Sequence, residues 1–247
     1  MLTFDIETAG LPDDHLRKIY EPLELPEPPG EFDPSTVRVG GLKDPDKIAA
    51  KIDAAKKSHS DLVAGHDGKC KAIATNHGEE FKDRAALDAV TGRVIAIGYF
   101  NPAADKSVID HGDERELIDR FWGKALSCRN EHRAMVGLNI HDFDLPFLVR
   151  RSWFLDVYVP DWAMQRSRYF DPVFVDLRKT WLCGQHGTSI KSSFDHLGKA
   201  FGTGGKPEGV SGGQFAELWE TDREKAIAYL ENDLRQPAIW AARMGII

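Results

Sequence analysis

Polar and apolar residues alternate at the start of the chain. In the run Leu2–Glu7, Phe4 and Ile6 are apolar, whereas Asp5 and Glu7 are acidic. A period of two predicts a β-strand, in which side chains two residues apart point to the same face. We therefore predict a strand whose two carboxylates project together, opposite an apolar face.

Further along, the hydrophobic pattern predicts more strands and several helices. Apolar runs predict strands, and apolar residues at helical spacing predict helices. Strands are expected at residues 93–100, 106–110, 134–138 and 173–177. Helices are expected at 113–126, from 144, near 191–201 and at 213–219 and 222–244. This order of elements predicts an α/β protein with a mixed sheet.

Residues 9–91 interrupt this pattern and are rich in Pro, Gly and charged residues. The segment 21–30 contains four prolines and must be a loop. A helix is expected over Asp44–Lys57, with Pro45 at its first position. Residues 59–78 are expected to be mobile. We therefore predict a loop-and-helix insertion after the first strand.

Composition agrees with one cytoplasmic domain covering 1–247. A chain of 247 residues that is 42% hydrophobic can bury a sizeable core. No apolar run is long enough for a membrane span, and no signal-peptide pattern is present. The three cysteines are too few and too scattered for a disulfide scaffold.

A third candidate carboxylate, Asp144, follows the apolar run 134–138. Parallel sheets place their chemistry at the carboxyl ends of strands, which favours a functional role for Asp144. A structural alternative is that Asp144 or Asp142 caps the helix that follows. Asp142 is also the weaker rival for a metal-binding role.

A fourth carboxylate, Asp233, lies four residues after Tyr229 in a stretch of helical periodicity, so the two share one helix face. A phenol beside a metal carboxylate can orient a bound water. The alternative is an ordinary amphipathic helix with a core tyrosine and a solvated acid.

The four carboxylates together describe a metal site, although each alone favours the structural alternative. Neighbouring carboxylates such as Asp5 and Glu7 repel each other and are costly to bury unless a cation holds them. Hard oxygen ligands suit Mg²⁺ or Mn²⁺. The constellation points to phosphodiester hydrolysis with two divalent metals.

These motifs resemble those of a known family. The runs Phe4–Thr8, Asn139–Pro146 and Tyr229–Asp233 are similar to the three motifs of the DEDD superfamily of 3′–5′ exonucleases, in the tyrosine-bearing subgroup. The second motif is closest to the proofreading domains of family-B DNA polymerases. More narrowly, nearly the whole chain resembles predicted stand-alone bacterial and phage exonucleases. The resemblance implies an RNase H-like fold, with a central mixed sheet flanked by helices.

The resemblance also implies an activity. It is the hydrolysis of single-stranded nucleic acid, DNA favoured, from the 3′ end to nucleoside 5′-monophosphates, with two Mg²⁺ or Mn²⁺ ions. Asp5 is expected to contact both ions, with Glu7 and Asp233 at the ion that activates water. Asp144 is expected to hold the second ion, and Tyr229 to orient the water.

Four residues are expected to contact the substrate: Thr8, Asn139, Phe143 and Lys191. The first three lie where the family holds the terminal nucleotide, and Phe143 would stack on a base. The structural alternative, in which Phe143 packs in the hydrophobic core, is at least equally favoured. Lys191 precedes two serines near a helix start, where a phosphate site or a simple helix cap is expected.

A net charge of −7 argues against a nucleic-acid partner. Two divalent ions would bring the loaded protein nearer −3, and basic residues are grouped locally, as at Arg178 and Lys179. Weak, salt-sensitive binding is therefore expected, with a possible partner in replication or repair. The alternatives to a DNA-favouring exonuclease are a 3′–5′ exoribonuclease and a non-catalytic binding module of the same fold.

Overall fold

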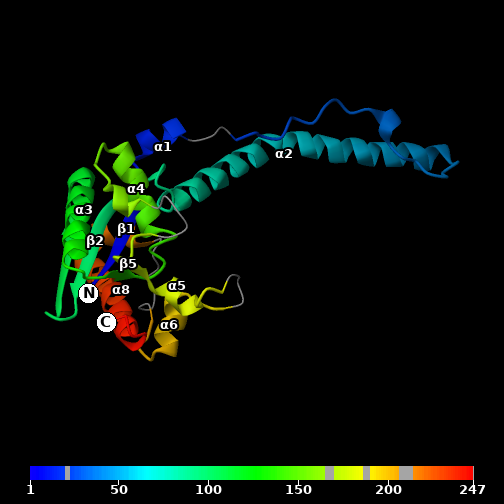
Figure 1. Ribbon diagram of the computed structural model, residues 1–247. Coiled ribbons are helices and arrows are strands. Elements are labelled where there is room, and N and C mark those ends of the chain that lie inside the picture. Colours follow the sequence, from blue (N-terminus) through cyan, green and yellow to red (C-terminus); the bar gives the residue numbers. More distant parts are fainter. Residues whose placement is uncertain (20–22, 165–169, 186–189, 206–213, 247) are drawn as a thin grey trace. The chain divides into compact units, whose positions relative to one another are not determined.

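The computed structural model describes residues 1–19, 23–164, 170–185, 190–205 and 214–246 (Figure 1). Its contacts divide the chain into two units. Unit 1 consists of Met1–Lys18 and Asp83–Ile247, and unit 2 of Ile19–Lys82. Unit 2 lies wholly within the insertion expected at residues 9–91.

A five-stranded mixed sheet forms the centre of unit 1, in the order β3-β2-β1-β4-β5. Its strands are β1 (Leu2–Gly10), β2 (Gly92–Asn101), β3 (Lys106–His111), β4 (Met135–Gly137) and β5 (Phe174–Asp176). The central strand β1 pairs antiparallel with β2 and parallel with β4. The pairs β2–β3 and β4–β5 are antiparallel and parallel, respectively.

Helices flank this sheet, which confirms the predicted α/β class (Figure 1). The helices of unit 1 are α1 (Asp13–Ile19), α3 (Glu114–Asn130), α4 (Asp144–Phe154), α5 (Leu177–Leu182), α6 (Phe194–Ala200), α7 (Phe215–Thr221) and α8 (Arg223–Arg243), with a short 3-10 turn at Asp161–Ala163. Helix α2 (Pro45–Ala85) and a 3-10 turn at Pro34–Thr36 belong mainly to unit 2. One core cluster joins the sheet to α3 and α4, and a second joins it to α7 and α8.

The alternation on β1 sorts its side chains between these two clusters. Phe4 lies in the first cluster, with its ring 5.3 Å from Phe121 and 6.4 Å from Phe174. Thr3 faces the other way, because its hydroxyl donates a hydrogen bond to the carbonyl of Leu234 on α8 at 3.0 Å. The odd-numbered acids of β1 share the face of Thr3 and therefore point towards α8.

Gly98 of β2 allows α8 to approach this face closely. It pairs with Asp5 across the β1–β2 ladder. A Cβ atom at Gly98 would lie 2.7 Å from Leu234 Cδ1 and 2.9 Å from Leu230 Cγ. Any larger residue would therefore push α8 away from the strand that carries the first two acids.

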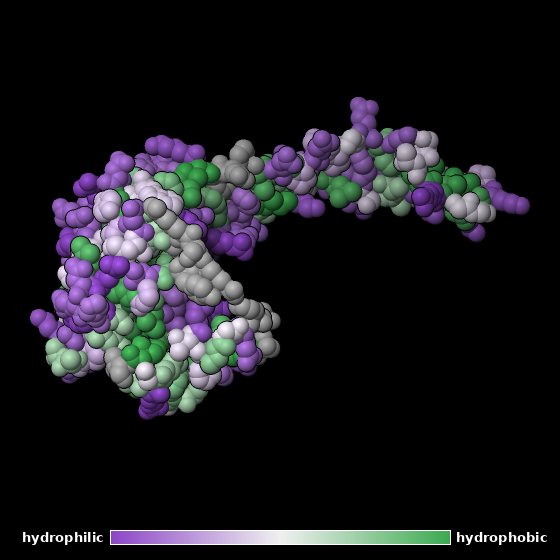
Figure 2. Space-filling view, in the orientation of Figure 1, coloured by the Kyte–Doolittle hydropathy of each residue, from purple (hydrophilic) through white to green (hydrophobic). Residues whose placement is uncertain are grey.

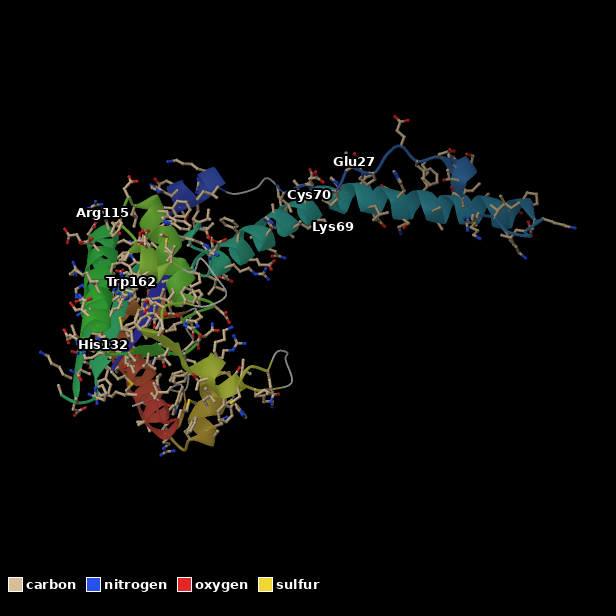
Figure 3. The ribbon with its side chains drawn as sticks, in the orientation of Figure 1. Glu27, Lys69, Cys70, Arg115, His132 and Trp162 are labelled. Atoms are coloured by element: carbon tan, nitrogen blue, oxygen red, sulfur yellow. The ribbon has the colours of Figure 1, made fainter. Side chains whose placement is uncertain are left out.

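Unit 2 combines part of α2 with an extended segment that runs along it. The imidazole Nε2 of His59 lies 2.8 Å from the carbonyl oxygen of Gly30, and that of His66 lies 3.1 Å from the carbonyl oxygen of Pro26. Figure 3 shows Glu27 on this segment beside Cys70 of the helix. None of the described residues of unit 2 is fully buried.

Helix α2 is longer than predicted. The expected helix ended at Lys57, and the segment 59–78 was expected to be mobile, but both lie within one helix that ends at Ala85. Partly covered residues recur every three or four positions through it, including His59, His66 and Ile73. His59 and His66 of this stripe contact the extended segment, whereas Figure 2 shows hydrophilic residues interspersed along the visible surface of unit 2.

Replacing Gly98 by Ala tests the close packing of α8. The added methyl group would collide with Leu230 and Leu234. We expect Gly98→Ala to lower the free energy of unfolding in urea by about 1–3 kcal/mol, the usual cost of overpacking.

Gly123→Ala is the matched control, because Gly123 is exposed in α3 and a Cβ atom there would have no neighbour within 4 Å. It should raise stability by up to about 1 kcal/mol, because Ala is the better helix former. Unchanged stability in Gly98→Ala would show that α8 is not held this closely.

Candidate active site

Three carboxylates from opposite ends of the chain meet on the α8 side of the sheet. Each of Asp5, Glu7 and Asp233 offers an oxygen, and these oxygens lie within 4.8 Å of one another. Glu7 and Asp233 are each 7% exposed, and Asp5 is half-buried. A concentration of negative charge with this little solvent is the arrangement that a bound cation stabilises.

Asp144 reaches the same strand from α4. Its side chain is 2% exposed, and its Oδ1 accepts a hydrogen bond from the backbone N–H of Ile6 at 3.2 Å. Ile6 lies between Asp5 and Glu7, so the structure brings all four predicted acids to β1. Helix α4 has Phe143 as its N-cap and no side-chain cap bond, which argues against a simple capping role for Asp144.

The environment of Asp144 favours its neutral form. Burial raises the pKa of Asp144 from 3.8 to about 7, and the nearby charge of Asp176 acts in the same direction. The N–H of Ile6 and a hydrogen bond with Asp5 oppose this rise in pKa without cancelling it. In the metal-free protein, Asp144 therefore titrates near neutral pH.

A fifth carboxylate, Asp176, shapes the loop before Asp144. Asp176 is 2% exposed, ends β5 and caps α5. It accepts hydrogen bonds from the backbone N–H groups of Asn139 at 2.9 Å, His141 at 3.0 Å and Arg178 at 2.8 Å. Asp176 is not among the predicted site residues, although it follows an apolar run, the kind of position that favoured Asp144.

Helix α8 carries both Tyr229 and Asp233. Tyr229 is 2% exposed, and its ring centroid lies 5.9 Å from that of Phe215 in the second core cluster. Asn232 Nδ2 lies 3.4 Å from Asp233 Oδ1. Residue 237 is a proline within the helix, so it has no N–H to donate to the carbonyl of Asp233.

The four expected substrate contacts have different surroundings. Thr8 is buried and donates its hydroxyl to the carbonyl of Ala86 at 2.6 Å. Asn139 adopts a left-handed backbone with φ of 65°. Phe143 is partly buried against the first core cluster. Lys191 is exposed, beyond the helix cap that Ser193 provides.

Asp142, the weaker candidate for a metal-binding role, and a histidine–cysteine set on α2 lie outside the cluster of three acids. Asp142 is exposed, and its Oδ2 lies 2.7 Å from the ammonium nitrogen of Lys179. Among the described residues, His66, Cys70 and His77 do not form a metal-competent group. His66 and Cys70 are neighbours because they lie one turn apart on α2.

Comparison with known proteins identifies the family. Residues 87–236, more than half of the chain, match a family model described as "Predicted 3'-5' exonuclease related to the exonuclease domain of PolB". The chain belongs to this family. Asp144, Tyr229 and Asp233 of the exonuclease lie inside the matched range, whereas Asp5 and Glu7 lie before it.

The fold of the exonuclease is also found in a solved polymerase structure. It resembles the family B DNA polymerase from the hyperthermophilic archaeon Pyrobaculum calidifontis, with a TM-score of 0.52 and 20% sequence identity. The likeness covers 66% of this chain and 23% of the polymerase chain. It confirms the RNase H-like exonuclease fold. No curated protein sequence matches the chain.

In the part of the chain that the structure describes, no helix is both long enough and apolar enough to cross a bilayer.

Replacing Asp144 by Asn should stabilise the metal-free protein at pH 8. Because the folded state raises the pKa of Asp144 from 3.8 to about 7, stability falls as the pH rises from about 4 to about 7. Above pH 7 Asp144 is ionised in the wild type, and burying this charge lowers the free energy of unfolding by on the order of 2–4 kcal/mol, or roughly 5–15 °C in melting temperature.

Thermal denaturation in chelator at about pH 4 and pH 8 checks this expectation. The melting temperature of Asp144→Asn should exceed that of the wild type at pH 8 and approach it at pH 4. Asp119→Asn, on the exposed face of α3, should differ little at either pH. A lower melting temperature for Asp144→Asn at pH 8 would contradict the cost of burying the charged form of this acid.

A cation that binds the carboxylates should stabilise the fold. At about a hundred times its dissociation constant, Mn²⁺ is expected to add about 2.7 kcal/mol, or roughly 5–10 °C in melting temperature. Asp5→Asn and Asp233→Asn should lose most of this increase, whereas Asp119→Asn should keep it. An undiminished increase in both site variants would place the bound Mn²⁺ elsewhere.

Proposed function

We propose that the chain is a divalent-metal-dependent 3′–5′ exonuclease acting on single-stranded nucleic acid, DNA favoured, and releasing nucleoside 5′-monophosphates. The observation that carries the proposal is the convergence of Asp5, Glu7 and Asp233 within 4.8 Å, beside the buried Asp144. Membership in a family related to a DNA polymerase domain supports both the reaction and the preference for DNA.

The donor set fits two Mg²⁺ or Mn²⁺ ions. The four side chains offer only carboxylate oxygens, which these hard cations prefer. When bound, the ions would supply the positive charge that stabilises the attacking and leaving oxygens of an in-line displacement.

The proposed roles of the four acids follow from where they lie. Asp5 and Glu7 project from one face of β1, so a rigid strand at the centre of the sheet fixes their spacing. Asp233 approaches from α8, and its distance from them depends on the close packing at Gly98. Asp144 releases its proton when the site is loaded, because a neighbouring cation favours its charged form.

We assign Tyr229 the role of orienting the attacking water. It lies one helical turn before Asp233, on the same face of α8. Packing against Phe215 restricts its ring, so its hydroxyl would be held in place rather than free to rotate away. This assignment would place the chain in the tyrosine-bearing subgroup.

The substrate contacts are proposed around this centre. Asn139 would hold the terminal nucleotide through its side-chain amide, and Phe143 would offer its exposed edge to a base. Thr8 would act through its backbone, because its hydroxyl is engaged by Ala86. Lys191 would contact a phosphate from its exposed position.

The test is the degradation of 5′-labelled single-stranded DNA and of its RNA counterpart. Both are incubated with Mg²⁺, with Mn²⁺ and with chelator. We expect a ladder that shortens from the 3′ end, faster on DNA, and no shortening in chelator. Asp144→Asn should lose more than the roughly 10–100-fold that removal of an outer-shell metal partner costs.

Asp119→Asn is the matched control and should keep wild-type activity. Faster shortening of RNA would favour the exoribonuclease. Intact strands with both metals would refute hydrolysis and favour a non-catalytic binding module.

A further inference from the structure

Two cations at the start of α5 lie beside the loop that leads to Asp144. Lys179 Nζ lies 2.7 Å from Asp142 Oδ2, and Arg178 Nη1 lies 3.4 Å from the same oxygen. All three side chains are between 39% and 48% exposed, so solvent reaches them. We call Arg178 and Lys179 the cation pair.

Arg178 is anchored within the loop. Its Nη1 donates to the side-chain oxygen of Asn139 at 2.6 Å, and its Nε donates to the hydroxyl of Ser192 at 3.0 Å. These bonds fix the guanidinium relative to Asn139, whose own N–H is held by Asp176. The cation pair therefore has a defined position relative to the proposed site, unlike a charge on a freely moving surface side chain.

Lys179 is held less firmly. Its ammonium group donates to the exposed carboxylate of Asp142, and exposed ion pairs contribute little free energy. A phosphate oxygen is an anionic acceptor of the same kind as a carboxylate oxygen. A phosphate can therefore replace Asp142 at small cost.

The cation pair is close to the acids of the site. Asp142 precedes Asp144 by two residues, so their Cα atoms are at most about 7.6 Å apart at 3.8 Å per trans peptide. Asp144 in turn contacts the backbone of β1 between Asp5 and Glu7. A strand whose terminal linkage lies at the acids therefore brings a neighbouring phosphate near Lys179.

We propose that Lys179, supported by Arg178, binds a backbone phosphate of the single strand next to the scissile one, and that Asp142 occupies this place when no strand is bound. The inference rests on the proposed function and adds to it a contact with the sugar–phosphate backbone. Such a contact is independent of base sequence. It also supplies a local positive charge in a chain of net charge −7.

Binding is measured apart from hydrolysis, by fluorescence anisotropy of a 5′-labelled oligothymidylate with phosphorothioate 3′ linkages, in Ca²⁺. Lys179→Ala should raise Kd about fivefold to tenfold, as expected for one charged hydrogen bond. It should also reduce the slope of log K against log salt by about 0.7, the value for one phosphate of a single strand.

Two further variants separate charge from structure. Lys179→Arg should restore most of the affinity, and Asp142→Asn should lower Kd, because it removes the competing anion. Lys199→Ala is the matched control, since Lys199 is an exposed lysine on α6, and it should leave Kd unchanged. Wild-type Kd and salt slope in Lys179→Ala, or weaker binding in Asp142→Asn, would overturn the inference.

The inference and the proposed function fail in different ways. A wild-type protein that binds the oligonucleotide in this Lys179-dependent manner but never shortens unmodified DNA would refute hydrolysis and keep the phosphate contact. Normal shortening with Kd unaffected by Lys179→Ala would refute the contact and keep hydrolysis. A wild-type protein that does not bind the strand would refute the contact outright.

Discussion

The alternation of side chains on β1 is the constraint on which the rest of unit 1 depends. Because helices pack on both faces of the sheet, the side chains on each face of β1 are covered and must find a partner. Phe4 and Ile6 supply the apolar side that α3 and α4 cover. Asp5 and Glu7 occupy the other side, where a purely apolar helix face would leave two charges without solvent. Asp233 and Asp144 come to the same place, so the negative charge increases there and a bound cation is the partner that would neutralise it.

The concentration of buried acids lowers the stability of the metal-free protein. Asp144 is buried so completely that its pKa rises to about 7, and its hydrogen bond to the N–H of Ile6 does not offset the loss of solvent. A site assembled for a cation is unfavourable without one, and functional sites commonly show this opposition between stability and activity. The same feature makes cation binding a source of folding free energy.

Much of this arrangement could be predicted from local sequence patterns. The strand over Leu2–Glu7 and the helix that carries Asp233 each have a clear period, an acid and a proline mark the start of the helix at Asp144, and the structure contains all three. The proximity of the acids could be expected only through the family resemblance, because a period says nothing about contacts between distant segments. The roles of these residues stay predictions.

What the sequence could not reveal depends on tertiary contacts. The length of α2 is one case, since its half-covered stripe becomes meaningful only when the extended segment packs on it. Asp176 is another, because its importance lies in the backbone N–H groups of a loop more than thirty residues away. Gly98 is a third case, because the sequence does not show which helix packs against a glycine within a strand.

The position of β1 ahead of the insertion has a consequence during synthesis. β1 is synthesised well before both of its neighbours in the sheet, which begin at residues 92 and 135. At typical translation rates of about 5–20 residues per second, the wait for β2 alone is several seconds. During this wait, β1 exposes two unpaired edges with which other nascent chains can pair, and such pairing leads to aggregation. Asp5 and Glu7 place like charges in that strand, and charges of this kind discourage pairing between copies. The acids that define the candidate site thereby also protect the chain before the site exists.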